Sequence, residues 1–91
     1  MASKKFDAGT SQSVTTDELF VKTVHLVAGP ANDATCVIYS NTSTVEIKLA
    51  AAKGTTSSFR LTGSTSVASA PVPGPVVIDV VGTGAWARID F

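Results

Sequence analysis

The feature that most constrains this chain is a two-residue alternation between apolar side chains and polar or small ones. It is clearest over residues 45–52, where the larger apolar members are Val45, Ile47 and Leu49. Successive side chains of a β-strand point to opposite faces, so this pattern predicts a strand with one face in a core and the other in solvent. The apolar spacing of an amphipathic helix occurs nowhere in the sequence, and we expect a helix content near zero.

Other segments have the alternation, or the β-branched and aromatic composition, of short strands. They are residues 19–28, 35–40, 57–61, 76–81 and 85–91. Turn-forming residues separate them at intervals of roughly eight to twelve residues, which is typical of antiparallel all-β domains. The chain is therefore predicted to be all-β: a single antiparallel β-sandwich or jelly-roll-like barrel of about six to eight short strands.

The connections between these segments carry their own predictions. An Asn-Thr-Ser-Thr turn joins residues 35–40 to residues 45–52, and we expect the two to form a hairpin. Residues 82–84, Gly-Thr-Gly, are also expected to be a hairpin turn, because no helix follows them as a phosphate-binding loop requires. Residues 62–70 are expected to be a loop with at most a short strand. Residues 71–75, with three prolines, are expected to be an extended loop or a sheet edge.

The beginning of the chain is polar and differs in composition from the rest. We expect residues 1–18 to form an extended arm in front of a β-sandwich domain at residues 19–91. A polar terminus is normally mobile unless something holds it, and a neighbouring subunit or a partner surface is the expected holder. The candidate partner-binding residues of this arm are Lys4, Lys5, Phe6 and Val14.

Charge and cysteine content narrow the classes of partner. Hydrophobic residues make up 44% of the chain and charged residues only 15%, with seven basic and seven acidic side chains and no net charge. This balance lacks the clustered cations of a nucleic-acid interface and favours contact with protein, including assembly with further copies. Cys36 has no second cysteine with which to form a disulfide. We expect no secretory signal and no membrane-spanning segment, so the protein is expected to be made inside the cell.

The residues that usually carry chemistry do not form a recognised pattern. His25 and Cys36 lack metal-ligand spacing, and no Gly-x-Ser-x-Gly elbow precedes a helix. Asp17 and Glu18 are adjacent, and adjacent side chains in a strand face opposite ways. We therefore expect no catalytic residues, no cofactor and no metal, and interpret the chain as a binding protein that is not an enzyme.

Trp86 and Arg88 are the candidate partner-binding residues of the last predicted strand. With Asp90 they fall on one face of that strand, opposite Ala87 and Ile89. An exposed Trp on a sheet is a typical anchor for a protein partner or for a sugar ring. The alternative is that a second sheet or the N-terminal arm covers it.

The order of these segments resembles small virion structural proteins of tailed bacteriophages over roughly residues 19–91. The resemblance lies in the strand at residues 21–26, the strand at residues 34–39 and the strand at residues 45–52 with its Lys-Gly-Thr-Thr end. It continues in the closing Val-Val-Gly-Thr-Gly-Ala sequence before Ile-Asp-Phe. It implies a capsid decoration or cement protein: an often trimeric β-sandwich on the outside of the shell that clamps capsid subunits.

If the resemblance holds, the partner is the major capsid protein or another virion protein, the site of action is the virion, and neither nucleic acid nor membrane is bound. Two alternatives remain open. The first is a tail or head-to-tail connector component. The second is a carbohydrate-binding or host-adhesion module that uses Trp86 and residues 71–75.

Overall fold

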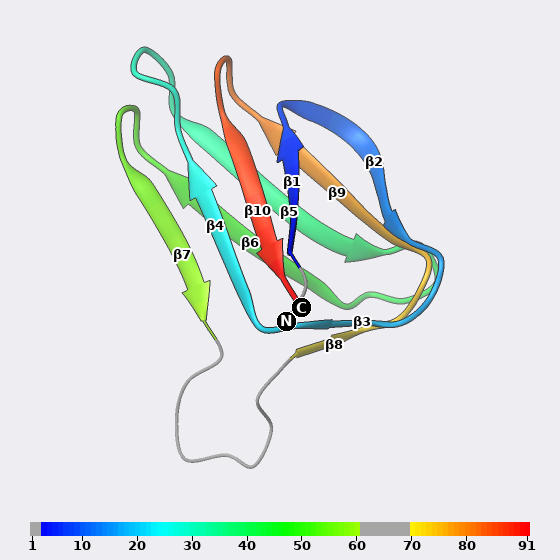
Figure 1. Cartoon of the computed structure of the whole chain (residues 1–91). Helices are drawn as coiled ribbons and strands as arrows, with labels where there is room; N and C mark the ends of the chain where they lie inside the picture. Colours follow the sequence, from blue (N-terminus) through cyan, green and yellow to red (C-terminus); the bar gives the residue numbers. More distant parts are fainter. Residues whose placement is uncertain (1–2, 61–69) are drawn as a thin grey trace.

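The computed structural model describes residues 3–60 and 70–91, and within them the chain forms ten β-strands and no helix. Two antiparallel four-stranded sheets pack face to face (Figure 1). Sheet A has the order β1 (Ser3–Asp7), β10 (Trp86–Asp90), β4 (Thr23–Val27) and β7 (Thr56–Arg60). Sheet B has the order β2 (Gly9–Thr15), β9 (Val76–Val81), β5 (Ala34–Ser40) and β6 (Glu46–Ala51). A two-stranded ribbon joins β3 (Leu19–Val21) to β8 (Ala70–Val72).

The predicted antiparallel β-sandwich is confirmed, and so is the hairpin formed by β5 and β6, whose partners run from Ala34↔Ala51 to Tyr39↔Glu46. The described residues include no helix that is long and apolar enough to cross a membrane. The prediction of a loop at residues 62–70 falls mostly on residues 62–69, which lie outside the described part of the chain.

The two sheets are linked in a regular way. Strand β1 leads into β2, β4 into β5, β6 into β7 and β9 into β10, and each pair occupies the same position in the two sheets. These four crossovers lie together at one end of the sandwich, at the top of Figure 1. We call this the crossover end. The sandwich thus consists of four consecutive strand pairs, each with one strand in sheet A and the other in sheet B. The pair of β1 and β2 lies at one side, and the pair of β6 and β7 lies at the other.

This connectivity corrects the prediction for residues 82–84. They were expected to close a hairpin, but β9 pairs with β2 and β5 in sheet B, whereas β10 pairs with β1 and β4 in sheet A. The Gly-Thr-Gly segment therefore carries the chain from one sheet to the other. A tight glycine turn is compatible with both geometries, so the local sequence could not distinguish them.

The N-terminal segment is also different from its prediction. Residues 3–7 pair with β10 from Ser3↔Asp90 to Asp7↔Trp86, and residues 9–15 pair with β9. Within the described residues, the segment predicted as an arm is therefore an edge strand in each sheet. Strands β10 and β9 of the same chain hold it in place.

Residues 19–28 were predicted as one strand and form two. The chain bends at Lys22, whose backbone amide donates a 2.9 Å hydrogen bond to the carbonyl of Asp90. Before this bend, Leu19 and Val21 are buried with Val72 of β8, while Phe20 is 51% exposed. The ribbon of β3 and β8 thus covers the end of the sandwich opposite the crossovers (Figure 1).

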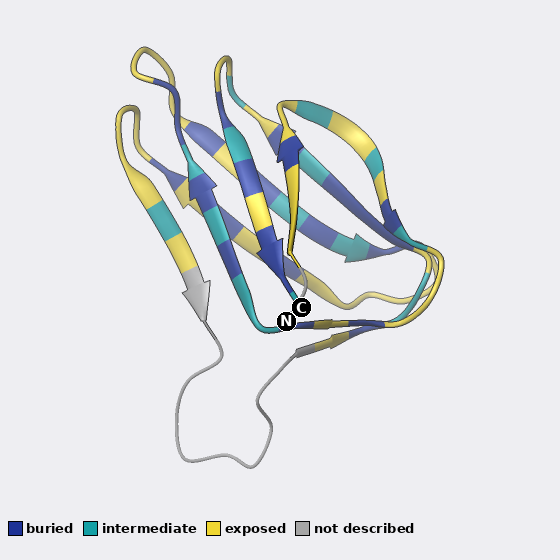
Figure 2. Ribbon diagram, in the orientation of Figure 1, coloured by how far each residue is buried: buried dark blue, intermediate teal, exposed yellow. Residues whose placement is uncertain are grey.

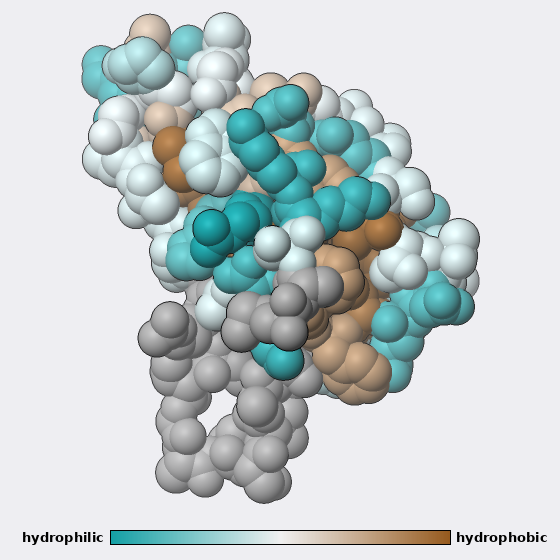
Figure 3. Space-filling model, in the orientation of Figure 1, coloured by the Kyte–Doolittle hydropathy of each residue, from teal (hydrophilic) through white to brown (hydrophobic). Residues whose placement is uncertain are grey.

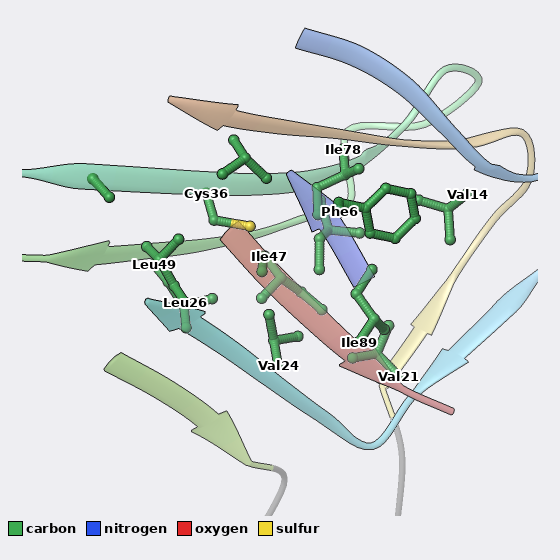
Figure 4. Packing of buried hydrophobic residues seen from close by; sticks show 14 of the residues in the cluster. Phe6, Val14, Val21, Val24, Leu26, Cys36, Ile47, Leu49, Ile78 and Ile89 are labelled. Carbon is green, nitrogen blue, oxygen red and sulfur yellow. The ribbon is translucent and has the colours of Figure 1, made fainter. Parts of the chain in front are cut away.

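The core lies between the inward faces of the two sheets, and burial alternates along the strands that build it (Figure 2). Burying such apolar side chains contributes about 1.5–3 kcal/mol each for the larger ones. Phe6 and Val14 of the predicted arm belong to this core (Figure 4), with exposed fractions of 5% and 8%. The largest fully buried side chains are Val21, Val24, Leu26, Cys36, Ile38, Val72, Val76, Ile78, Val80 and Ile89.

Close backbone approaches fix the crossover end. A Cβ atom on Gly29 would collide with the carbonyl oxygen of Thr83 in the neighbouring crossover. A Cβ atom on Gly82 would lie 2.7 Å from the carbonyl oxygen of Asp33, and Gly82 also has a φ of 134°, which disfavours any other residue. The β4–β5 and β9–β10 crossovers can therefore pack together only with glycine at both positions.

Candidate functional site: the outer face of sheet A

The outer face of sheet A gathers polar and charged side chains from four strands that are far apart in sequence. Direct cross-strand neighbours are Lys5 and Arg88, Arg88 and His25, and His25 and Ser58. Polar side chains cover β1, β10 and β4 in Figure 3. We call this surface the polar face, and its members are Lys5, Asp7, Thr23, His25, Ser58, Trp86, Arg88 and Asp90.

Asp90 is the organising group of the polar face. It is only 7% exposed, although it lies on the outer side of β10. The Thr23 hydroxyl donates to its Oδ2 atom, and the Arg88 guanidinium approaches both oxygens, with Nε 3.2 Å from Oδ1 and Nη2 3.3 Å from Oδ2. The hydrogen bond from Thr23, together with the charge of Arg88, lowers the pKa of the Asp90 carboxyl against the opposing effect of burial. Asp90 is therefore held as a carboxylate that orients Arg88.

His25 joins Asp90 to the edge strand β7. Its Nε2 atom lies 3.6 Å from Oδ2 of Asp90, and its Nδ1 atom lies 2.9 Å from Oγ of Ser58. A serine, a histidine and an aspartate thus stand in series. In a hydrolytic triad the serine bonds Nε2 and the carboxylate bonds Nδ1, which is the reverse of this arrangement. The described residues also enclose no pocket beside Ser58. We therefore interpret the series as part of a polar network on an open sheet.

Trp86 lies at the crossover end of the polar face and is half-buried. The Lys5 ammonium stands 4.9 Å from the centroid of its ring, within the range of a cation–π contact. The Nζ atom of Lys5 also lies 3.7 Å from Oδ1 of Asp7. A residue of the predicted arm thus covers part of Trp86, and the contact fixes where the lysine charge is presented.

The structure brings together three of the predicted partner-binding residues: Lys5, Trp86 and Arg88. Lys4 is exposed on β1, with its ammonium 5.4 Å from the ring centroid of Phe6. For Phe6 and Val14 the prediction of partner contact is wrong, because both are core side chains. They were assigned to a partner because the segment was taken for an arm; its own chain buries them instead.

Sequence reasoning missed Thr23, His25, Ser58 and Asp90 as members of one surface. Alternation along residues 23–27 and 86–90 shows which side chains share a face of each strand. It could have placed Thr23, His25 and Asp90 on the side away from the core. Nothing local shows that β10 lies between β1 and β4, or that β7 follows β4. The network depends on that strand order.

The structure also keeps two further groups of residues apart. Cys36 lies in the core, where burial raises the pKa of its thiol to about 12, whereas His25 lies on the polar face, so the two do not meet. Trp86 pairs with Val27 near the crossover end, whereas Pro71 pairs with Phe20 in the ribbon at the opposite end (Figure 1). A single sugar site built from Trp86 and residues 71–75 is therefore not assembled.

Comparisons with known proteins identify no relative. No protein-family model, no curated protein and no solved structure matches the chain.

Proposed function

We propose that this chain is a non-enzymatic virion structural protein, a capsid decoration or cement protein that binds capsid subunits through the polar face. The observation that carries the proposal is the way Lys5, Trp86 and Arg88 are held in place before any partner arrives. Lys5 rests over Trp86, and Arg88 is held by the carboxylate of Asp90. The resemblance to phage virion proteins supplies the biological setting of the proposal.

The composition of this surface supports a protein partner. Trp and Arg are enriched among the residues that dominate protein–protein binding energy, and side chains ordered beforehand lose less entropy on binding. The side chains of Lys5 and Arg88 remain 59% and 47% exposed. They can therefore contact carboxylates of a capsid subunit while keeping their own partners. An open sheet face also suits the broad contact of a standard interface, about 800 Å² per partner.

The test is binding to capsids of the encoding virus that were assembled without this chain. Wild-type protein should co-sediment with them to saturation. Trp86→Ala and Arg88→Ala should each weaken binding by at least about tenfold, the effect of roughly 1.4 kcal/mol. Ser13→Ala, an exposed position on the outer side of β2 in sheet B, is the matched control and should bind like wild type.

Three outcomes would contradict the proposal in different ways. Absence of the chain from purified virions would reject a virion role. Imaging that places the chain in the tail or connector would replace the capsid partner with a tail protein. Binding of an isolated glycan that Trp86→Ala abolishes would favour an adhesion module instead.

A further inference from the structure

The two sheets have four edge strands, and three of them carry features that oppose pairing with another strand. Strand β1 contains the consecutive residues Lys4 and Lys5, and both are exposed. Strand β6 exposes Glu46 and Lys48, which form a 3.2 Å ion pair. Charged side chains on an edge strand are a common protection against edge-to-edge association.

The third protected edge is β2, which is irregular. Its pairing with β9 shifts register between Gly9 and Gln12 and again between Ser13 and Thr15. Ser11 has a φ of 54° and its amide donates a 2.6 Å hydrogen bond to Oδ1 of Asp79. Such bulges twist an edge away from further strands.

Strand β7 lacks these features apart from Arg60 at its end. It pairs with β4 over all five residues, from Thr23↔Arg60 to Val27↔Thr56, with no register shift. Its sequence is Thr-Ser-Ser-Phe-Arg, without proline and with a single charged residue at its end. None of the other described strands pairs with its outer edge. It is the regular, nearly uncharged edge of the sandwich.

We propose that β7 pairs with β7 of a second copy of this chain, antiparallel and centred on Ser58, to form a two-fold dimer. A strand that pairs with itself needs only one open edge, and the contact closes after two copies. A ring of three copies joined by strand pairing would need a second open edge, and β1, β2 and β6 are protected. The absence of net charge removes long-range repulsion between copies.

The register decides what the dimer looks like. Centring on Ser58 places it opposite Ser58 of the partner subunit and keeps outward-facing residues on the same side of the joined sheet. Sheet A then continues through the dimer axis as eight strands, and the two polar faces become one surface. Each Ser58 keeps its bond to His25 within its own copy. The dimer does not require the capsid role, and its test uses the purified chain alone.

A cysteine crosslink tests the register directly. Residues directly opposite in an antiparallel pair have Cα atoms about 4.5–5.5 Å apart, which lies inside the disulfide range of about 4.4–6.8 Å. Ser58→Cys should therefore form a covalent dimer under mild oxidation. The native Cys36 is fully buried with a raised thiol pKa and should not react. Ser13→Cys, exposed on edge strand β2, is the matched control and should remain monomeric in non-reducing gels.

Sedimentation over a concentration series tests the association itself. Wild type should approach the mass of two chains as concentration rises. Ser58→Lys places like charges across the axis and should raise the dimer dissociation constant by up to about fivefold. Ser13→Lys makes the same change at an exposed position on edge strand β2 and should leave dimerisation unchanged.

A wild-type protein that stays monomeric throughout would overturn the proposal, and so would a trimer. Equal crosslinking of Ser58→Cys and Ser13→Cys would also overturn it. If Ser58→Lys misfolds by circular dichroism, the disulfide experiment still decides the register. Capsid binding is not measured in either experiment, so failure of the dimer and failure of the virion role are distinguishable.

Discussion

The two faces of strand β10 have different roles: the inward face packs in the core, and the outward face carries residues that we propose bind a partner. Ala87 and Ile89 point inward and are fully buried, whereas Trp86 and Arg88 point outward and stay partly accessible. Both sets are attached to the same five residues of backbone, so packing of the inward side chains also fixes the backbone from which Trp86 and Arg88 project. The difference teaches that the core supplies the free energy of folding and also orders a surface whose side chains contribute little to it.

Asp90 does not fit this division. It lies on the outer side, yet it is as buried as the core and binds three polar side chains. A buried carboxylate is tolerated only when it is paired in this way. Asp90 therefore links the two regions, because its loss should disturb both stability and the orientation of Arg88.

The largest effect is expected from deleting residues 2–16. This change removes an edge strand from each sheet and takes Phe6 and Val14 out of the core. We expect the remaining chain to lose its cooperative unfolding transition, because side chains beneath both strands become exposed. Circular dichroism and the dispersion of amide proton signals in NMR measure this. A deletion product that unfolds cooperatively near the wild-type midpoint would show that the segment is an appendage.

A pair of adjacent substitutions tests the division of β10 itself. Ile89→Ala should lower the free energy of unfolding by about 2–5 kcal/mol, because it leaves a cavity in the core. Arg88→Ala, one residue away, should lower it by about 1–2 kcal/mol, because Asp90 keeps its bond from Thr23, while weakening partner binding. Urea titration gives both values. Equal losses for the two variants would abolish the distinction between the faces.

Asp90→Asn should have an intermediate effect, about 1–3 kcal/mol, because it removes the charge-assisted bond to Arg88. Acid should also lower the free energy of unfolding, because it protonates the Asp90 carboxylate. The pKa of Asp90 is lowered in the folded state, so its contribution is present above the unfolded value of 3.8 and is lost as pH falls from there through the folded value. Urea midpoints at neutral pH and near pH 3 measure the slope. Asp90→Asn should make that slope shallower, and an unchanged slope would remove Asp90 from the network.

The smallest effect is expected at Ser58. Ser58→Ala removes one hydrogen bond between exposed atoms and should change stability by no more than about 0.5 kcal/mol. The imidazole nitrogen resonances of His25 should still shift, since Nδ1 loses its partner. NMR of labelled histidine detects this. Unaltered resonances would mean that Ser58 and His25 are not bonded in solution.

Much of the fold could be predicted because the alternation of apolar side chains is local. Residues 45–52 contain β6, and the hairpin with β5 follows from the short turn between them. The N-terminal strands could not be predicted in this way. Strand β1 buries only Phe6 among five residues, and β2 interrupts its alternation with a bulge, so neither shows a periodic signal.

The sequence by itself determined that the chain is all-β, which side chains alternate along most strands, and that Trp86 and Arg88 share a face. Tertiary structure alone decided which strands are neighbours, that the Gly-Thr-Gly segment changes sheets, and that Thr23, His25 and Arg88 gather around Asp90. The physical reason is the distance along the sequence between the residues that interact. Alternation follows from the direction of successive Cβ atoms within one strand, whereas strand order depends on pairing between residues up to 87 positions apart, such as Ser3 with Asp90.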